Sequence, residues 1–115
     1  MNDNRKPYVP PKAKTMPIDA IVELLGRDEL LCQLAEEASE LAQAALKLRR
    51  AYSKKNPTPK TVEQCVDNLL EEIGDVSVCC TALGYDSPLN RSRISAVYSE
   101  KVLRWAERLE ENHAE

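Results

Sequence analysis

Two short stretches of the chain place closely spaced carboxylates among apolar residues. The first, Leu34 to Leu41, reads LAEEASEL, and the second, Leu69 to Val76, reads LLEEIGDV. A carboxylate at the edge of an apolar helix face loses water on folding, which costs free energy unless a counter-charge or a hydrogen-bond donor compensates. Clustered carboxylate oxygens without His or Cys are the ligands that hard divalent cations prefer. The two stretches therefore predict a site for Mg²⁺, with Mn²⁺ as a substitute.

On the earlier helix, the angular positions of the glutamates separate site candidates from surface charges. An α-helix turns by about 100° per residue, so Glu37 lies about 40° from Leu41 and inside the apolar arc. Glu40 lies about one position further round the wheel from the apolar arc than Glu37, and Glu36 is the most solvent-facing of the three glutamates. Glu37 and Glu40 are the candidates from this helix.

The later helix repeats the arrangement. Glu72 falls between Cys65 and Cys79, within the apolar arc, and Asp75 lies at its border, whereas Glu71 points nearly opposite. Glu72 and Asp75 are three residues apart and therefore share one side of the helix, as Glu37 and Glu40 do on theirs. The four predicted metal ligands are Glu37, Glu40, Glu72 and Asp75.

Basic residues near an apolar face form a second group of candidates. Lys101 lies between Val97 and Trp105 on its helix, with Arg104 beside it, and could hold phosphate oxygens. The alternative is that the Lys101 stem packs while its ammonium reaches water. Lys47, on the same strip as Glu40, is a weaker candidate for phosphate binding.

Ordinary explanations compete with a metal site. Most glutamates on helices are solvated surface charges, and this explanation suits Glu36 and Glu71 well. A di-iron bundle of the ferritin type needs imidazole ligands, but His113, the only histidine, lies near the C-terminus. A metal-storage or redox site is therefore disfavoured.

The pattern of apolar residues predicts an all-α fold without strands. Gly26 should end a short first helix. Thr61 and Gln64 form a capping box at the start of the helix that Gly84 ends. Ser87–Pro88 begins the last helix. Gly74, in mid-helix, suggests close helix approach. The expected elements are an arm over 1–16, a short helix over 18–25, and three main helices over 27–53, 61–83 and 88–109, with one domain spanning 17–112.

Composition excludes several classes of protein. The 115 residues carry a net charge of −3, which argues against general nucleic-acid binding, and no apolar run reaches the length of a membrane span. The four cysteines, none of them in a CxxC pair, are typical of reduced thiols in a cytoplasmic protein.

EEASE at 36–40 followed by EEIGD at 71–75 resembles the EExxE…EExxD signature of the all-α nucleoside triphosphate pyrophosphohydrolases, the MazG-like group. KVLRW at 101–105 is similar to the basic stretch that follows the second motif in that family. The resemblance spans roughly Arg27 to Leu109. One departure is the link between the motifs, which is somewhat long and leaves the subfamily open.

The resemblance implies Mg²⁺-dependent hydrolysis of an NTP or dNTP, between the α- and β-phosphates, to the monophosphate and pyrophosphate. By position in the motifs, the residues that match the metal ligands of the family are Glu37, Glu40, Glu72 and Asp75. Either Glu37 or Glu40 could also accept the proton of the attacking water. Lys101 and Arg104 would hold the outer phosphates. The base preference and the physiological role, whether house-cleaning, dNTP pool control or a phage-encoded task, stay open.

Two other functions remain open: a non-enzymatic helical regulatory or interaction protein, and a phosphoribosyl-ATP pyrophosphatase of the same superfamily. The wide apolar arcs, which Leu31, Leu46 and Val78 extend, leave more apolar surface than one short bundle buries. We therefore expect a homo-oligomer, either a dimer or a tetramer, as the family resemblance also implies.

Overall fold

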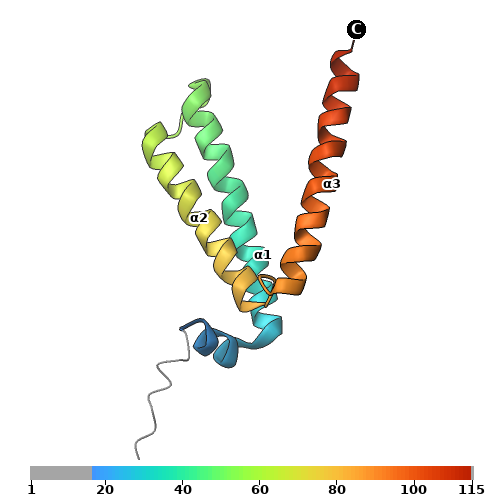
Figure 1. Ribbon diagram of the computed structural model, residues 1–115. Helices are drawn as coiled ribbons and strands as arrows, with labels where there is room; N and C mark the ends of the chain where they lie inside the picture. The colour runs from blue at the N-terminus through green and yellow to red at the C-terminus, as the bar shows by residue number, and fades with distance from the viewer. Residues whose placement is uncertain (1–16, 115) are drawn as a thin grey trace, which may run out of the picture. The chain divides into compact units, whose positions relative to one another are not determined.

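The computed structural model describes residues 17–114 and consists of three α-helices (Figure 1). The helices are α1 (Pro17–Ser53), α2 (Val62–Ala82) and α3 (Pro88–His113), and the described residues contain no strand. The all-α fold and the three main helices predicted from the sequence are confirmed. The predicted arm over 1–16 lies outside the described residues.

Local sequence signals set the ends of α2 and α3. The Thr61 hydroxyl accepts a hydrogen bond from the Gln64 N–H at 3.1 Å, while the Thr61 N–H donates to the Gln64 side chain at 3.0 Å, which completes the capping box. Gly84, with φ of 82°, follows α2, and Ser87 caps α3 immediately before Pro88. These boundaries agree with the sequence prediction.

Gly26 interrupts the long first element. Its backbone, with φ of 77° and ψ of 171°, is not helical, although α1 continues on both sides of it. Glycine adopts this conformation without the steric cost that a Cβ atom would bring. The structure thus places the break at the predicted residue, and α1 consists of two helical segments that meet at a kink at Gly26.

The chain divides into two compact units, one ending at Leu83 and the other beginning at Gly84. In the first unit α1 and α2 pack side by side as a helical hairpin, joined by the loop over 54–61 (Figure 1). The second unit consists of the turn after Gly84 and α3.

A regular seam of side chains joins the two helices of the hairpin. Its positions alternate in steps of three and four residues, the spacing of a heptad repeat, and none of its side chains is exposed. The seam consists of Leu30, Leu34, Glu37, Leu41, Ala44, Leu48 and Ala51 from α1, and of Val62, Cys65, Leu69, Glu72, Val76, Cys79 and Leu83 from α2 and its C-cap.

Small residues are among the most buried members of the seam. Ala44 is 1% exposed and Cys65 is 2% exposed. The 3.6-residue spacing of apolar residues would also place Ala38, Ala45 and Ile73 inward, but all three are exposed. A seam with a period of 3.5 residues drifts by about 20° per heptad from the 3.6-residue wheel, so the wheel misplaces positions along helices of this length.

Helix α3 differs from the hairpin because none of its side chains is buried. The apolar residues that recur at helical spacing along α3, Ile94, Val97, Val102, Trp105 and Leu109, are all exposed. No helix among the described residues has the length and apolar character that crossing a membrane requires.

Candidate metal site

One glutamate from each helix occupies a seam position in the hairpin. Glu37 lies between Leu34 and Leu41 along the seam of α1, and Glu72 lies between Leu69 and Val76 along that of α2. Both glutamates are half-buried, whereas Glu36 and Glu71, their neighbours in sequence, are exposed. The heptad spacing therefore directs one acid of each EE pair into the seam and the other into solvent.

Three carboxylates meet at this point of the hairpin. One oxygen each from Glu37, Glu40 and Glu72 lies within 4.8 Å of the other two. Glu40, three residues after Glu37, is exposed and approaches the pair from the edge of the seam. This separation is short enough for one cation to contact all three carboxylates, because Ca²⁺ and Mg²⁺ bind oxygen ligands at about 2.0–2.6 Å.

The hydrogen bonds of the cluster are incomplete. The Gln33 amide donates to Oε1 of Glu37 at 2.9 Å. Oε2 of Glu37 and Oε2 of Glu72 are both shielded from solvent and accept no hydrogen bond. Although neither glutamate is a buried residue as a whole, each points one oxygen into a place that water does not reach. A shielded acceptor without a donor is costly, and such groups call for a partner.

Mutual repulsion and loss of solvent shift the protonation of the cluster. The charge of Glu37 raises the pKa of Glu40, and partial desolvation adds to the effect. Desolvation raises the pKa of Glu72, followed by the charges of Glu40 and Asp75. The carboxyls of Glu40 and Glu72 are thus harder to ionise than ordinary glutamates. A bound cation would lower their pKa values, because it favours the charged form.

Cys79, a buried seam residue, lies close enough to sense the same charges. Burial raises the pKa of the Cys79 thiol, and the charge of Glu37 raises it further. A thiol with a raised pKa stays protonated and is a poor metal ligand. All four cysteines of the chain are free thiols.

Asp75, the fourth predicted ligand, is not part of the three-carboxylate cluster. It is half-buried one turn after Glu72, and its charge contributes to the raised pKa of Glu72. The structure thus brings together three of the four predicted ligands, and Asp75 as a ligand stays a prediction.

The residues present fit a hard divalent cation. The donors are carboxylate oxygens, two of them lack any other partner, and the nearby thiol favours its neutral form. Oxygen-only donor sets suit Mg²⁺ and Mn²⁺ rather than zinc. The three glutamates could therefore hold such an ion across the hairpin, with Asp75 next to it.

The predicted phosphate-binding residues are distributed over both units. Lys47 is half-buried on α1, two turns beyond Glu40. Lys101 and Arg104 are exposed on α3, where Arg104 forms an ion pair with Glu100 at 3.5 Å. The structure does not bring these two residues and the carboxylates into one unit.

Sequence reasoning missed Gln33, the donor to Glu37. Gln33 precedes Glu37 by four residues, a spacing at which side chains on a helix meet, so the signal was present in the sequence. The amide fixes one oxygen of Glu37 and leaves the other available.

Comparison of the chain with protein-family models finds no match, and neither the curated proteins nor the solved structures yield one. The family resemblance therefore depends on the two acidic motifs and their placement on facing helices.

Proposed function

We propose that this protein is a Mg²⁺-dependent nucleoside triphosphate pyrophosphohydrolase of the MazG-like type. The observation that supports the proposal best is the meeting of Glu37, Glu40 and Glu72 with two shielded, unpartnered oxygens. A helical regulatory protein would have no use for two acids in its packed seam, where apolar side chains would stabilise it more.

The hairpin supplies the ligands for the cation. Glu37, whose Oε1 accepts from Gln33, would hold the ion together with Glu72 and Glu40, and the carboxylate of Asp75 would add negative charge nearby. When bound, the ion would neutralise the phosphate charges and activate water for attack on the α-phosphorus.

Among the carboxylates, Glu40 is best placed to accept the proton of the attacking water. One oxygen of Glu37 accepts from Gln33 and the other is shielded, whereas Glu40 is exposed and within reach of water. A general base must lie within hydrogen-bond distance of the proton that it removes, and only an accessible carboxylate meets that condition here.

The triphosphate needs cations besides the metal. In our proposal Lys101 and Arg104 hold the outer phosphates, with Lys47 as an additional contact. The active form in this proposal is a homo-oligomer, at least a dimer. Its substrates are cytoplasmic nucleotides.

The test is an assay of pyrophosphate release from a panel of NTPs and dNTPs with Mg²⁺. The matched variants are Glu72→Gln and Glu71→Gln, which remove one negative charge each from adjacent positions. We expect Glu72→Gln to lower turnover by at least about a hundredfold, because loss of second-shell groups alone costs 10- to 100-fold. Glu71→Gln should change it by less than about threefold.

Two results would contradict the proposal. One is a wild-type chain that releases no pyrophosphate from any nucleotide of the panel with Mg²⁺ or Mn²⁺. The other is equal loss in both variants, because Glu71 is exposed and lies outside the cluster. Circular dichroism of each variant checks that helicity is unchanged.

A further inference from the structure

The charges of the chain are distributed unevenly along its sequence. Residues 41–62, which include the C-terminal part of α1 and the loop that leads to α2, contain no aspartate or glutamate. Six cations lie in this segment, namely Lys47, Arg49, Arg50, Lys54, Lys55 and Lys60. The rest of the chain carries all 19 acids against the other ten of the 16 lysines and arginines. The loop end of the hairpin is thus positively charged, although the chain as a whole has a net charge of −3.

Two of these cations share one face of α1 near its end. The face consists of Leu46, Arg49, Arg50 and Ser53, which follow one another at helical spacing. Lys54, the first residue after the helix, has a φ of 56°, and its N–H donates to the Arg50 carbonyl at 3.1 Å. A left-handed residue with this hydrogen bond is a common way to end a helix and to turn the chain. The loop therefore begins beside the face that carries the two arginines.

The helix face and the loop together form a hollow of about 300 Å³, called here the basic hollow. It is lined by Leu46, Arg49, Arg50, Ser53, Lys55 and Asn56. Arg49, Lys55 and Asn56 are exposed and Arg50 is half-buried, so solvent reaches the hollow. Asn56 adds an amide donor to the three cations, whereas the Ser53 hydroxyl already donates to the Arg50 carbonyl at 3.4 Å.

No acid offsets the three cations of the basic hollow. Among the described residues, Arg49, Arg50 and Lys55 form no ion pair, and the nearest acids in the sequence are Glu40 and Glu63. Like charges gathered at one place repel one another, and an anion that contacts all three would replace this repulsion by attraction. The forked donors of arginine match the oxygens of phosphate groups in particular.

The helix dipole explains these cations only in part. A cation in the last turn of a helix is stabilised by the partial negative charge of the carbonyl end, and Arg50 occupies that turn of α1. This effect does not explain why Lys55, which lies beyond the helix, lines the same hollow as the two arginines. It also does not explain the lack of acids in the loop. A site for an anion accounts for both features.

We propose that the basic hollow binds a chain of linked phosphates, as found in inorganic pyrophosphate and in nucleotides. A single phosphate group carries a charge of about −1.5 to −2 at neutral pH, which leaves one of the three cations unbalanced. Two or more linked phosphates provide enough negative charge for all three. They also provide enough oxygens for the donors of both arginines, Lys55 and Asn56.

This site is separate from the candidate metal site. An α-helix rises by about 1.5 Å per residue, so Arg49 lies about 14 Å further along α1 than Glu40. The basic hollow holds its ligand with side-chain cations and needs no divalent ion. The proposal therefore does not depend on the proposed function, and each can fail without the other.

A nucleic-acid strand fits the charge distribution less well than a compact anion does. Strand binding uses cations that follow the backbone along a groove, often together with aromatic side chains on which bases stack. Here three cations converge on one hollow, and no aromatic residue lines it. The acidic remainder of the chain would repel a long anion.

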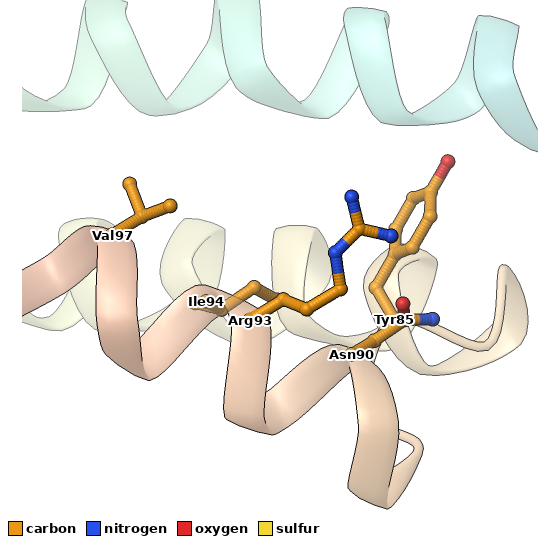
Figure 2. A pocket seen from close by; sticks show the side chains of 5 residues that line it. All are labelled: Tyr85, Asn90, Arg93, Ile94 and Val97. Atoms are coloured by element: carbon orange, nitrogen blue, oxygen red, sulfur yellow. The ribbon is translucent and has the colours of Figure 1, made fainter.

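A hollow at the start of α3 provides a contrast and a control. Figure 2 shows this hollow, of about 360 Å³, with the Arg93 side chain extended on the same side as Tyr85. Arg93 is the one cation among the described residues that line it, and Ile94 and Val97 are apolar. A single cation among apolar groups does not replace the water around a multiply charged anion. We therefore expect no pyrophosphate to bind there.

Isothermal titration calorimetry of the 115-residue chain with pyrophosphate, in the presence of EDTA, tests the proposal. EDTA removes divalent ions, so the bare carboxylates of the metal site repel the anion and binding is confined to the basic hollow. We expect one pyrophosphate per chain, and binding of inorganic phosphate at least about tenfold weaker. A wild-type chain that binds no pyrophosphate at concentrations up to about 1 mM would overturn the proposal.

Paired variants show where the anion binds. Arg49→Gln and Lys55→Gln each remove one exposed cation of the basic hollow, one from the helix and one from the loop, and should weaken pyrophosphate binding about tenfold. Lys60→Gln removes a cation of the same loop that does not line the hollow, and Arg93→Gln removes the cation on α3. Both controls should change binding by less than about twofold. Circular dichroism checks that helicity is unchanged in all four variants.

Two competitors identify the kind of anion. ATP that displaces pyrophosphate would support a site for nucleotide phosphate chains, and ATP that does not would support a site for the inorganic anion. A short single-stranded DNA that binds more tightly than pyrophosphate would overturn the proposal in favour of a nucleic-acid surface. Equal losses of pyrophosphate binding in Lys60→Gln and Lys55→Gln would overturn it as well, because they would show a diffuse basic surface rather than a site.

Discussion

In the α1–α2 hairpin two carboxylates lie inside the packed seam, whereas α3 carries apolar side chains that are exposed. The hairpin buries small residues such as Ala44 and Cys65 and leaves two glutamate oxygens without partners. Helix α3 buries no side chain and exposes Ile94, Val102 and Trp105. Each region is incomplete, and each lacks a different kind of partner.

The kind of partner that each region needs can be inferred from the groups that lack one. Shielded carboxylate oxygens call for a cation or a hydrogen-bond donor, because apolar contact does not compensate the loss of water around a charge. Exposed apolar side chains call for more apolar surface, which a second copy would supply in the proposed homo-oligomer.

The double change Glu37→Leu with Glu72→Leu should abolish turnover and stabilise the metal-free protein. Leucine continues the heptad seam and removes two carboxylates that repel each other, and replacing buried charges by apolar residues is often neutral or stabilising. Thermal denaturation without divalent ions should show a melting temperature several degrees above that of wild type. A lower melting temperature would mean that the two acids stabilise the hairpin by themselves.

Metal-free wild type should lose stability as the pH rises. The pKa of Glu40 is raised chiefly by the charge of Glu37, and that of Glu72 chiefly by desolvation. Because these folded-state values exceed the unfolded ones, the stabilising contribution is full below the usual glutamate pKa and disappears as the pH passes through the raised values.

Melting temperatures measured from pH values below the usual glutamate pKa up to neutral pH, with and without Mg²⁺, check whether stability falls as the pH rises. The decline should be smaller in Glu72→Gln, and Mg²⁺ at neutral pH should raise the melting temperature of wild type but not that of the variant. An identical pH dependence in both proteins would show that the cluster does not cause it.

Lys101→Met should raise KM for the triphosphate by about threefold or more, because it removes one cation while keeping the stem's packing. Steady-state kinetics at several substrate concentrations measure the change in KM. An unchanged KM would mean that the Lys101 stem packs while its ammonium reaches water.

Gly74→Ala should stabilise the hairpin by about 0.5–1 kcal/mol, because glycine in a helix interior is less favourable than alanine by that amount. An added Cβ at Gly74 meets no atom within 4 Å, so the close helix approach that the sequence suggested at this position is wrong for this chain. Urea denaturation measures the change. A loss of stability would indicate that another copy covers Gly74.

The sequence predicts the helix ends better than the buried positions. Thr61 with Gln64, Gly84 and Ser87 act through local hydrogen bonds and backbone conformation, which neighbouring residues determine. The identity of the core depends on how α1 and α2 pack, and the heptad register placed Ala44 inside and Ala45 outside. That choice of register requires both helices together.

The residues of the site could be predicted from spacing along each helix, but their contacts across the two helices could not. Glu37, Glu40 and Glu72 could be chosen because their wheel positions and motif spacing agree, and the structure brings them together. The unpartnered state of two oxygens, by contrast, depends on side-chain rotamers across the seam, which spacing along one helix cannot reveal.

Binding of Mn²⁺, followed by electron paramagnetic resonance during titration of the 115-residue chain, tests whether the seam glutamates form a metal site. Wild type and Glu71→Gln should bind the ion alike, whereas Glu72→Gln should bind it at least about tenfold more weakly. Equal binding by Glu72→Gln and Glu71→Gln would contradict the assignment of the seam glutamates as a metal site.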